Sequence, residues 1–314
     1  MTYESGYTGR AHIDQGFAKA ALVPDVVLQA MDADVIKTYV ELGLEIFVRA
    51  DKRLTGLTAP GEALLPIVER LLVEADNLKR AGDDFAQQGR GTLRVAATHS
   101  QARYALPPAV RDFRSAHPRV GLHMHQGSPH HIAQMLIDGS ADVGIATEAL
   151  ASYDELVALP CYRWTHVVVV PPDHELAGIA GGALTLQQLA RYPVVTYESG
   201  YTGRAHIDQG FAKAGLAPDV VLQAMDADVI KTYVELGLGV GIVAAIAFDA
   251  ERDTHLRAID ARHLFAANTT RLAVRHGAYL RDFVYDFIAG FAPPLTKALL
   301  QRALHAPPGT DHSL

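Results

Sequence analysis

The sequence predicts an α/β fold with two Rossmann-like sub-domains, and three observations lead to this prediction. From Thr92 onward, short runs rich in β-branched residues alternate with helical stretches, which is typical of parallel sheets covered on both faces. The alternation starts again at Tyr162–Pro172. The chain has 314 residues, 49% of them hydrophobic, and is therefore long enough for two cores. We expect a cleft between the sub-domains, with the end of the chain returning to the first one.

Each sub-domain is predicted from its own series of strands and helices. In the first series, the expected strands are 92–98, 120–127 and 142–147, and the expected helices are 101–116 and 129–138. In the second series, the expected strands are 166–172, 193–198, 220–225 and 240–245, and the expected helices are 204–214 and 227–236. After 256–260, a strand at 269–277 and a helix at 280–291 follow.

A long amphipathic helix is predicted before the first strand, over the segment 58–89. Its apolar residues form one stripe at helical spacing, namely Leu64, Leu65, Val68, Leu71, Leu72, Ala75 and Leu78. A helix with one apolar stripe and no adjacent domain usually pairs with a partner helix. The alternative is a helix packed on its own chain.

Composition excludes several classes of function. The net charge is −7, so no global basic field attracts nucleic acid or anionic membranes. No apolar run approaches a membrane span, and no signal pattern opens the sequence. The single cysteine, Cys161, rules out an internal disulfide and reads as a small apolar filler in a reducing compartment. We therefore expect a cytoplasmic protein without a membrane segment.

Polar side chains lie where predicted strands end, and they indicate a ligand pocket. They are Thr98, Ser100, Gln101, Thr147 and Thr202. In open parallel sheets, ligands bind outside the carboxyl ends of strands, where helix N-termini offer free N–H groups. These residues are therefore predicted to converge on one small anionic ligand. The alternative interpretation is that they are ordinary helix caps and turn residues.

Other motifs point to no metal, cofactor or catalytic chemistry. His123 and His125 share one face of a predicted strand, but His130 and His131 begin another element and no carboxylate or thiolate is close in sequence. The glycines of "GLGVG" (237–241) follow a helix and precede a strand, so helix C-capping is favoured over phosphate binding. No nucleophile motif or acid–base pair is evident, and the chain does not read as an enzyme.

Several motifs resemble those of the LysR-type transcriptional regulators of the CysB type. They include "THSQARYALPPAVRDF", "PRVGLHMHQGSP", "ADVGIATEAL", "LPCYRW", "YTGRAHID", "DADVIKTYVELGLGVG" and "YDFIAGFAP". The resemblance covers about 250 residues from Leu42 onward. It implies sub-domains of the periplasmic-binding-protein type, a linker helix that dimerises, homotetramers, and a winged helix-turn-helix that binds promoter DNA.

The resemblance also implies a regulatory role and a site. Members control sulfate assimilation and cysteine biosynthesis in response to acetylserine, sulfate, thiosulfate or sulfide. The family's anion-binding positions fall on Thr98, Ser100, Gln101, Thr147 and Thr202, and Ser100 stands where relatives usually have threonine. Trp164 matches a position at the sub-domain hinge that is used in the inducer response. No cofactor is implied.

These inferences give an expected domain organisation. It consists of residues 1–44 as a duplicated segment, 45–58 as a remnant wing, 59–90 as the linker helix, 91–163 with 268–295 as the first effector sub-domain, 164–267 as the second, and 296–314 as a C-terminal tail.

The N-terminal segment is a copy of another part of the chain. Residues 2–44 match residues 196–238 except that Ala21 replaces Gly215 and Val23 replaces Ala217. Structural repeats diverge further than this, so the copy looks like a product of recombination or misassembly that has replaced the helix-turn-helix. We expect loosely packed helices around Gly9–Ala20 and Ala33–Leu42, a copied strand 26–31 without neighbours, and no ligand site at Thr8, the copy of Thr202.

DNA reading by this chain is therefore doubtful. Residues 3–41 contain three cationic residues, Arg10, Lys19 and Lys37, and a larger number of carboxylates. The attraction of this segment to DNA phosphates should therefore be weak. An alternative function is a stand-alone module that binds an effector and dimerises without operator binding. A more remote alternative is a cytosolic solute-binding protein.

Overall fold

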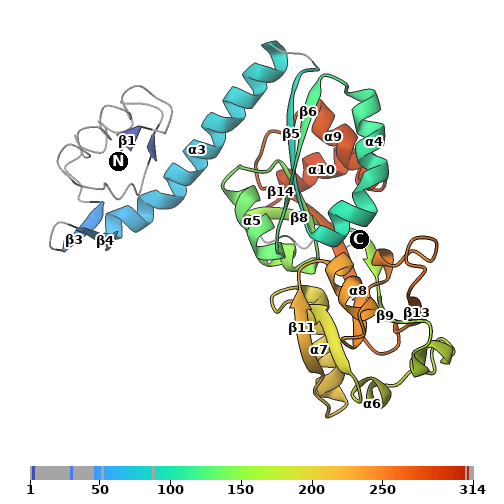
Figure 1. Cartoon of the computed structure of the whole chain (residues 1–314). Coiled ribbons are helices and arrows are strands. Elements are labelled where there is room, and N and C mark those ends of the chain that lie inside the picture. The colour runs from blue at the N-terminus through green and yellow to red at the C-terminus, as the bar shows by residue number, and fades with distance from the viewer. Residues whose placement is uncertain are drawn as a thin grey trace, which may run out of the picture. The chain divides into compact units, whose positions relative to one another are not determined.

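The computed structural model describes residues 2–3, 29–30, 46–50, 53–86, 89–307 and 310. The chain divides into two compact units, residues 1–79 and 80–314, whose elements carry labels in Figure 1. Among the helices of these described residues, none is both long and apolar enough to cross a membrane.

Two short strands of the first unit repeat a pairing found in the second unit. β1 (Thr2–Tyr3) pairs in parallel with β2 (Gln29–Ala30). Their equivalents in the second copy, Thr196–Tyr197 and Gln223–Ala224, pair in the same direction and register. The expectation that the copied strand 26–31 lacks neighbours is therefore wrong at Gln29 and Ala30. The physical reason is that both partners of this pairing lie inside the copied segment. The helices expected around Gly9–Ala20 and Ala33–Leu42 lie outside the described residues.

A hairpin and a long helix complete the described part of the first unit. β3 (Phe47–Ala50) pairs antiparallel with β4 (Arg53–Leu57), within the segment where a wing is expected. α3 (Ala59–Ala86) follows, and the hydroxyl of Thr58 accepts a hydrogen bond from the amide of Gly61 at 3.2 Å. This bond caps the start of the helix.

The apolar stripe of α3 is unevenly buried within the single chain. Val68 is buried, whereas Leu71 is 52% exposed and Leu78 is 75% exposed. The stripe therefore leaves large apolar side chains in contact with solvent when the chain is alone.

The second unit begins with a five-stranded sheet. This sheet and the helices that cover it are called the first lobe. The strand order is β6-β5-β7-β14-β8. The strands are β5 (Gly91–Ala97), β6 (Val120–Gln126), β7 (Val143–Ala146), β8 (Leu156–Trp164) and β14 (Asn268–Arg275). The helical segments are η1 (Gln101–Ala105), α4 (Leu106–Ala116), α5 (Pro129–Ile137), η2 (Glu148–Ser152), α9 (Asp282–Phe291) and α10 (Lys297–Leu304).

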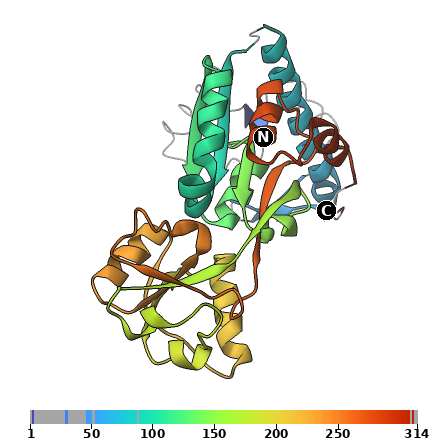
Figure 2. The same cartoon turned by 90° about the vertical axis from the view of Figure 1, so that its right-hand side faces the viewer.

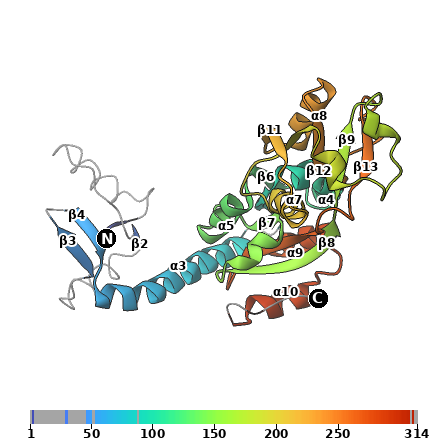
Figure 3. The same cartoon turned by 90° about the horizontal axis from the view of Figure 1, so that it is seen from below.

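Both faces of this sheet are covered. Residues of α4, α9 and α10 pack with Leu93 and Val95 in one core, and Ile132 and Leu136 of α5 pack with Ala96 in another. α10 lies close to β8 (Figure 3), and its Leu300 and Leu304 belong to the first of these cores. Much of the expected C-terminal tail is therefore a packed helix.

The second lobe contains the other five-stranded sheet, with the order β11-β10-β12-β9-β13. The strands are β9 (His166–Val170), β10 (Pro193–Tyr197), β11 (Asp219–Ala224), β12 (Val240–Ala244) and β13 (Arg257–Asp260). The helical segments are η3 (Glu175–Gly178), α6 (Leu186–Leu189), α7 (Thr202–Lys213), α8 (Ala227–Glu235) and η4 (Ala245–Ala247). Ile207 and Phe211 of α7 pack on one side, and Ile230 and Val234 of α8 on the other.

The prediction of parallel sheets is wrong in part, because each sheet is mixed. β14 runs antiparallel to β7 and β8, and β9 runs antiparallel to β12 and β13. The antiparallel strands are those next to the crossings between the lobes. One crossing lies between Trp164 and His166, and the other between Asp260 and Asn268; Figure 2 shows the crossing segments, yellow-green and orange, side by side between the lobes.

One local prediction differs from the structure, and another is confirmed by it. The single helix expected over 101–116 is divided into η1, a π-helical turn, and α4. The division lies beside Pro107 and Pro108, which have no amide hydrogen to donate. At the end of α8, Gly237 adopts φ 81° and donates its amide to the carbonyl of Val234 at 2.9 Å, which confirms the predicted C-cap.

Candidate functional site

A small pocket lies between the two lobes, where strands of both sheets end. Its volume is about 30 Å³. It is lined by Thr98, His99, Ser100, Gln101, Thr147, Trp164, Tyr197, Tyr201, Thr202, Gly203 and Met225. Thr98 to Gln101 follow β5, Thr147 follows β7, and Tyr201 to Gly203 lie at the start of α7. The structure thus brings all five side chains predicted from strand ends, and Trp164, to one place.

The cap interpretation of these hydroxyl groups is not supported by the geometry. Ser100 and Thr147 occupy the positions before helical turns, yet neither side chain makes a capping hydrogen bond. Thr202 is the first residue of α7 rather than its cap. Their side chains are therefore not used to terminate helices.

The first turns of two helical segments, η1 and α7, border the pocket with their backbone amides. In η1, the amide of Ala102 is the first that donates to a carbonyl of the preceding turn, that of Thr98 at 3.0 Å. In α7, the amide of Ala205 donates in the same way to the carbonyl of Tyr201 at 3.1 Å. The preceding amides of each turn have no partner within their own helix. Such N–H groups, together with the helix dipole, favour a bound anion.

Gln101 is positioned differently from the hydroxyl residues. It is 2% exposed. Its amide nitrogen donates to the Thr270 hydroxyl at 3.0 Å, and its amide oxygen accepts a hydrogen bond from the Tyr162 hydroxyl. Both ends of the side chain are therefore engaged by β8 and β14, and Gln101 fixes the floor of the pocket in the first lobe.

One side of the pocket is closed by contacts between the lobes. The hydroxyl of Thr147 lies 2.5 Å from that of Thr202. Next to them, Glu148 Oε1 lies 3.5 Å from His206 Nε2, and Glu148 Oε2 accepts the amide of Thr269 at 2.8 Å. The two predicted threonines thus bond each other across the cleft.

A second set of contacts between the lobes is made by charged and polar residues, which we call the latch: His99, Arg103, Tyr104, Asp226, Asp228 and Lys231. His99 Nε2 lies 2.9 Å from Asp226 Oδ2, and Arg103 Nε lies 3.1 Å from Asp228 Oδ2. The Tyr104 hydroxyl donates to Asp228 Oδ1 at 2.5 Å. These contacts join η1 of the first lobe to the start of α8 in the second.

Within the latch, Asp228 is held in its ionised form by its hydrogen bonds. Burial acts to raise the pKa of Asp228, but the hydrogen bonds from Tyr104 and Lys231 outweigh it, and the net pKa lies below the usual range. Lys231 is itself buried and donates to Asp253 Oδ1 at 2.9 Å and to the carbonyl of Ala247 at 2.9 Å. Asp228 therefore remains ionised at neutral pH.

Trp164 lies at the crossing between the lobes and borders the pocket. It is the last residue of β8 and lies opposite Asn268 of β14. Its ring packs edge-on to His166 with 5.2 Å between centroids, and burial lowers the pKa of His166 to about 3, so this imidazole is neutral. A β-carbon at Gly203 would lie 3.3 Å from Trp164 Cη2. The start of α7 is thus fitted closely against the hinge.

The residues of the second lobe that line the pocket, and the latch, were not predicted from the sequence. Tyr197, Tyr201 and Met225 line the pocket, and none of them was predicted as a site residue. Asp228 lies at the start of a predicted helix, where an acidic residue is ordinarily explained by the helix dipole. Its partner Arg103 is far away in sequence, so no local signal connects the two.

The remaining candidate residues have ordinary surroundings. Burial raises the pKa of the Cys161 thiol to about 12, which leaves it neutral and fits a packing role. His130 Nδ1 lies 2.7 Å from the Tyr153 hydroxyl. Over the described part of the chain, no group of three or more His, Cys, Asp or Glu side chains is arranged to hold a metal ion.

The fold and the pocket define a two-lobed α/β ligand-binding domain. The family model described as the LysR substrate binding domain matches residues 86–292, and the chain belongs to the LysR family. Two relatives come from Burkholderia cenocepacia. The HTH-type transcriptional regulator SsuR is 55% identical over 258 residues, covering 82% of this chain and 83% of the relative. The HTH-type transcriptional regulator CysB is 52% identical over 270 residues, covering 86% of each.

A solved structure supports the same assignment of the fold. The crystal structure of the cofactor-binding domain of the Cbl transcriptional regulator is similar with a TM-score of 0.66 and 43% identity. It covers 70% of this chain and 96% of that chain. The relatives are transcriptional regulators by name, so the resemblance read from the motifs is confirmed at the level of the family and of its CysB, SsuR and Cbl members.

Proposed function

We propose that this chain is an effector-binding regulator of the CysB type, which acts on genes of sulfate assimilation and cysteine biosynthesis and is not an enzyme. The proposed effector is a small oxyanion or acyl-serine, namely sulfate, thiosulfate or acetylserine. It would be bound by Thr98, Ser100, Gln101, Thr147 and Thr202. The observation that carries the proposal is the convergence of these residues on one pocket between the lobes, beside the first turns of η1 and α7.

The residues that line the pocket suit an anion site in which the hydrogen-bond donors are neutral groups. Apart from the imidazole of His99, which is paired with Asp226, the side chains that line the pocket include no basic group. Neutral N–H and O–H donors can bind a fully desolvated oxyanion because each such hydrogen bond is charge-assisted.

The pocket is so small that binding of an effector requires a movement of the lobes. A volume of about 30 Å³ admits little more than one or two water molecules. The Thr147–Thr202 hydroxyl contact of 2.5 Å closes one side of the pocket. We infer that the effector takes the place of this contact, so that each hydroxyl bonds the anion instead of the other hydroxyl. The lobes then move apart on this side, which differs from closure of an open cleft.

Such a movement couples the pocket to the rest of the molecule. The latch opposes separation of the lobes because its ion pairs and hydrogen bonds connect η1 to α8. An effector shifts the balance only by the difference between its affinities for the two arrangements. In a homodimer or homotetramer joined along α3, a change of lobe spacing would be transmitted as a change in the arrangement of protomers.

Calorimetric titration of sulfate and of acetylserine into the full chain tests the site. Thr98→Ala removes one hydrogen bond to a charged ligand, and we expect a loss of about 1.5–3 kcal/mol, or 10- to 150-fold in Kd. Thr202→Ala also removes the competing bond to Thr147, so its net loss should be smaller, about 1–2 kcal/mol. Ser115→Ala is the matched control, because Ser115 is an exposed hydroxyl residue of α4 that bonds the carbonyl of Arg111 at 3.0 Å. Unchanged affinities in both threonine variants would refute the assignment.

A second function is favoured by one specific observation, the copied N-terminal segment. Residues 2–44 match residues 196–238 and carry few cations to neutralise phosphates. The alternative is therefore a module that binds its effector and dimerises but does not bind an operator. A mobility-shift assay distinguishes the two functions, as set out below.

A further inference from the structure

Ion pairs attach the last two turns of α3 to the first lobe, away from the latch. These turns belong to the same compact unit as the two lobes. Arg80 Nη1 lies 2.5 Å from Asp142 Oδ1, and Asp84 Oδ1 accepts a hydrogen bond from Arg281 Nε at 3.1 Å. The hydroxyl of Tyr279 donates to Asp84 Oδ2 at 3.1 Å. We call Arg80, Asp84, Asp142, Tyr279 and Arg281 the anchor.

The anchor is shielded from solvent, unlike most surface ion pairs, which contribute little to stability. The side chain of Asp142 is 4% exposed. Arg94 Nη2 lies 2.9 Å from Asp142 Oδ1, and the amide of Arg94 donates to Asp142 Oδ2 at 2.8 Å. Burial acts to raise the pKa of Asp142, but the bonds and charges of Arg94 and Arg80 outweigh it, and the pKa lies below its usual range. A charged carboxylate with several donors fixes the geometry of its partners.

The strands that meet at the anchor lead to the pocket. Arg94 lies in β5, which is followed by Thr98, and Asp142 directly precedes β7, which is followed by Thr147. β5 and β7 are parallel neighbours in the sheet. At about 3.3 Å per residue, these paired strands span roughly 13–17 Å between the anchor and the pocket. A short and stiff connection therefore joins the two.

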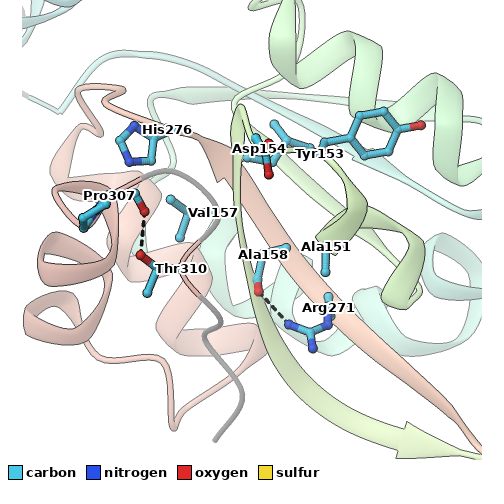
Figure 4. A pocket seen from close by; sticks show the side chains of 10 residues that line it. Ala151, Tyr153, Asp154, Val157, Ala158, Arg271, His276, Pro307 and Thr310 are labelled. Atoms are coloured by element: carbon cyan, nitrogen blue, oxygen red, sulfur yellow. Dashed lines mark hydrogen bonds between the residues drawn. The ribbon is translucent and has the colours of Figure 1, made fainter.

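β14 makes a third connection, from the anchor to the crossing between the lobes. The strand begins at Asn268, beside the crossing, and its far end leads to the loop that carries Tyr279 and Arg281. Its pairing with β8 is supplemented by a side-chain bond, in which Arg271 Nη1 donates to the carbonyl of Ala158 at 2.8 Å (Figure 4). The position of the anchor is thus fixed by three strands of one sheet.

We propose that the anchor makes the end of α3 and the first lobe one rigid body, so that this end of α3 follows the half of the pocket with Thr98 and Thr147. The inference rests on the proposed function in taking these threonines as effector ligands. An effector that separates the lobes then displaces the second lobe, with Thr202, relative to both the first lobe and the end of α3.

Distances between paired spin labels in the full chain test this proposal. All proteins carry Cys161→Ala, and an excess of unlabelled chain confines the signal to distances within one chain. Gly82→Cys places one label on α3, where an added β-carbon lies in open space. The second label is introduced by Ser115→Cys in α4 of the first lobe, or by Lys213→Cys in α7 of the second; both positions are exposed.

The two label pairs have different expected responses. Between positions 82 and 115 we expect one narrow distance distribution that sulfate does not shift. Between positions 82 and 213 we expect a shift when sulfate is added. The second response tests the movement of the lobes, whereas the first tests the anchor.

Arg80→Gln combined with Asp84→Asn breaks the anchor from the side of α3. Asp142 keeps its bonds to Arg94, and Arg281 still donates to a backbone carbonyl at 2.6 Å, so the lobe itself retains its ion pairs. We expect the distribution between positions 82 and 115 to become roughly twice as wide or wider, because the helix end is then free to open locally. The affinity for sulfate in calorimetry should stay unchanged, since the pocket residues are intact.

Asp112→Asn is the matched control, because it removes an exposed ion pair with Arg111 on α4 and should leave the width unchanged. A distribution between positions 82 and 115 that is broad with the anchor intact, that shifts with sulfate, or that stays narrow in the double variant overturns the proposal. If the double variant fails to fold by circular dichroism, Arg80→Gln alone decides by the same widths. If sulfate does not bind, the proposed function fails, while a narrow distribution that widens in the variant still supports the anchor.

Discussion

The Tyr104→Phe substitution tests whether the latch opposes effector binding. The Tyr104 hydroxyl donates to Asp228 Oδ1 at 2.5 Å across the lobes. Removing the hydroxyl leaves Asp228 with two partners, Lys231 and Arg103, so no carboxylate is left unpaired. The variant therefore removes one contact between the lobes and creates little new strain.

The magnitude follows from the environment of this bond. A hydrogen bond to a charged acceptor contributes about 1.5–3 kcal/mol when buried. Asp228 is about a third exposed, and solvent screening reduces the contribution to about 1–2 kcal/mol. If the effector separates the lobes, this free energy no longer opposes binding, and Kd for sulfate should fall about 5- to 30-fold.

Calorimetric titration of sulfate into the full chain measures this effect. Tyr153→Phe is the matched control, because the Tyr153 hydroxyl bonds His130 within the first lobe at 2.7 Å. Weaker binding by Tyr104→Phe would refute the reasoning, because it would show that the effector needs the lobes held together. Equal affinity in the two variants and the unaltered chain would show that the latch does not act on the pocket.

Three further predictions concern association, pH and DNA. Replacing Leu71 and Leu78 with Glu should shift the mass in light scattering toward the monomer, since each paired leucine contributes roughly 1.5–3 kcal/mol when buried; a monomeric unaltered chain would contradict dimerisation through α3. The pKa of His166 is about 3 in the folded chain and about 6.5 when unfolded, so the unfolded chain binds more protons between these values. Urea unfolding should show stability falling as pH drops from about 6.5 toward 3, with no contribution from His166 above that range, and His166→Phe should flatten this slope; an unaltered slope would exclude His166 as its source. In a mobility-shift assay on a cysteine-biosynthesis promoter at moderate salt, this chain should show no sequence-specific shift, whereas a relative with a helix-turn-helix should; comparable shifts would overturn the expectation.

That Thr98, Thr147 and Thr202 lie together could be predicted from the sequence because the features involved are local. Thr98 and Thr147 each follow a strand that periodicity identifies, and the rule that ligands bind at strand ends brings them together. Thr202 follows from the same rule applied to β10 and α7. None of these inferences needs a contact between residues distant in sequence.

The missed features depend on pairings between distant segments. β8 escaped prediction because Pro160 and Cys161 interrupt its apolar run, and it is the pairing with β14 that makes it a strand. The mixed direction of the sheets has the same origin. Similarly, the hydrogen bonds of the Gln101 side chain to Thr270 and Tyr162 could not be predicted, because these residues reach it only when β8 and β14 fold against η1.

The copied segment that contains β1 and β2 has a practical consequence for solution experiments. Cleavage after Arg10 and Lys19 releases the peptide AHIDQGFAK, and cleavage after Arg204 and Lys213 releases an identical one from α7. A covalent surface-labelling measurement that is read from such peptides by mass spectrometry would therefore report the sum of two environments for the segment that forms the helix bordering the pocket. Gly215 and Ala217 distinguish the second copy from Ala21 and Val23, and peptides that span them give the separate signal that such a measurement needs.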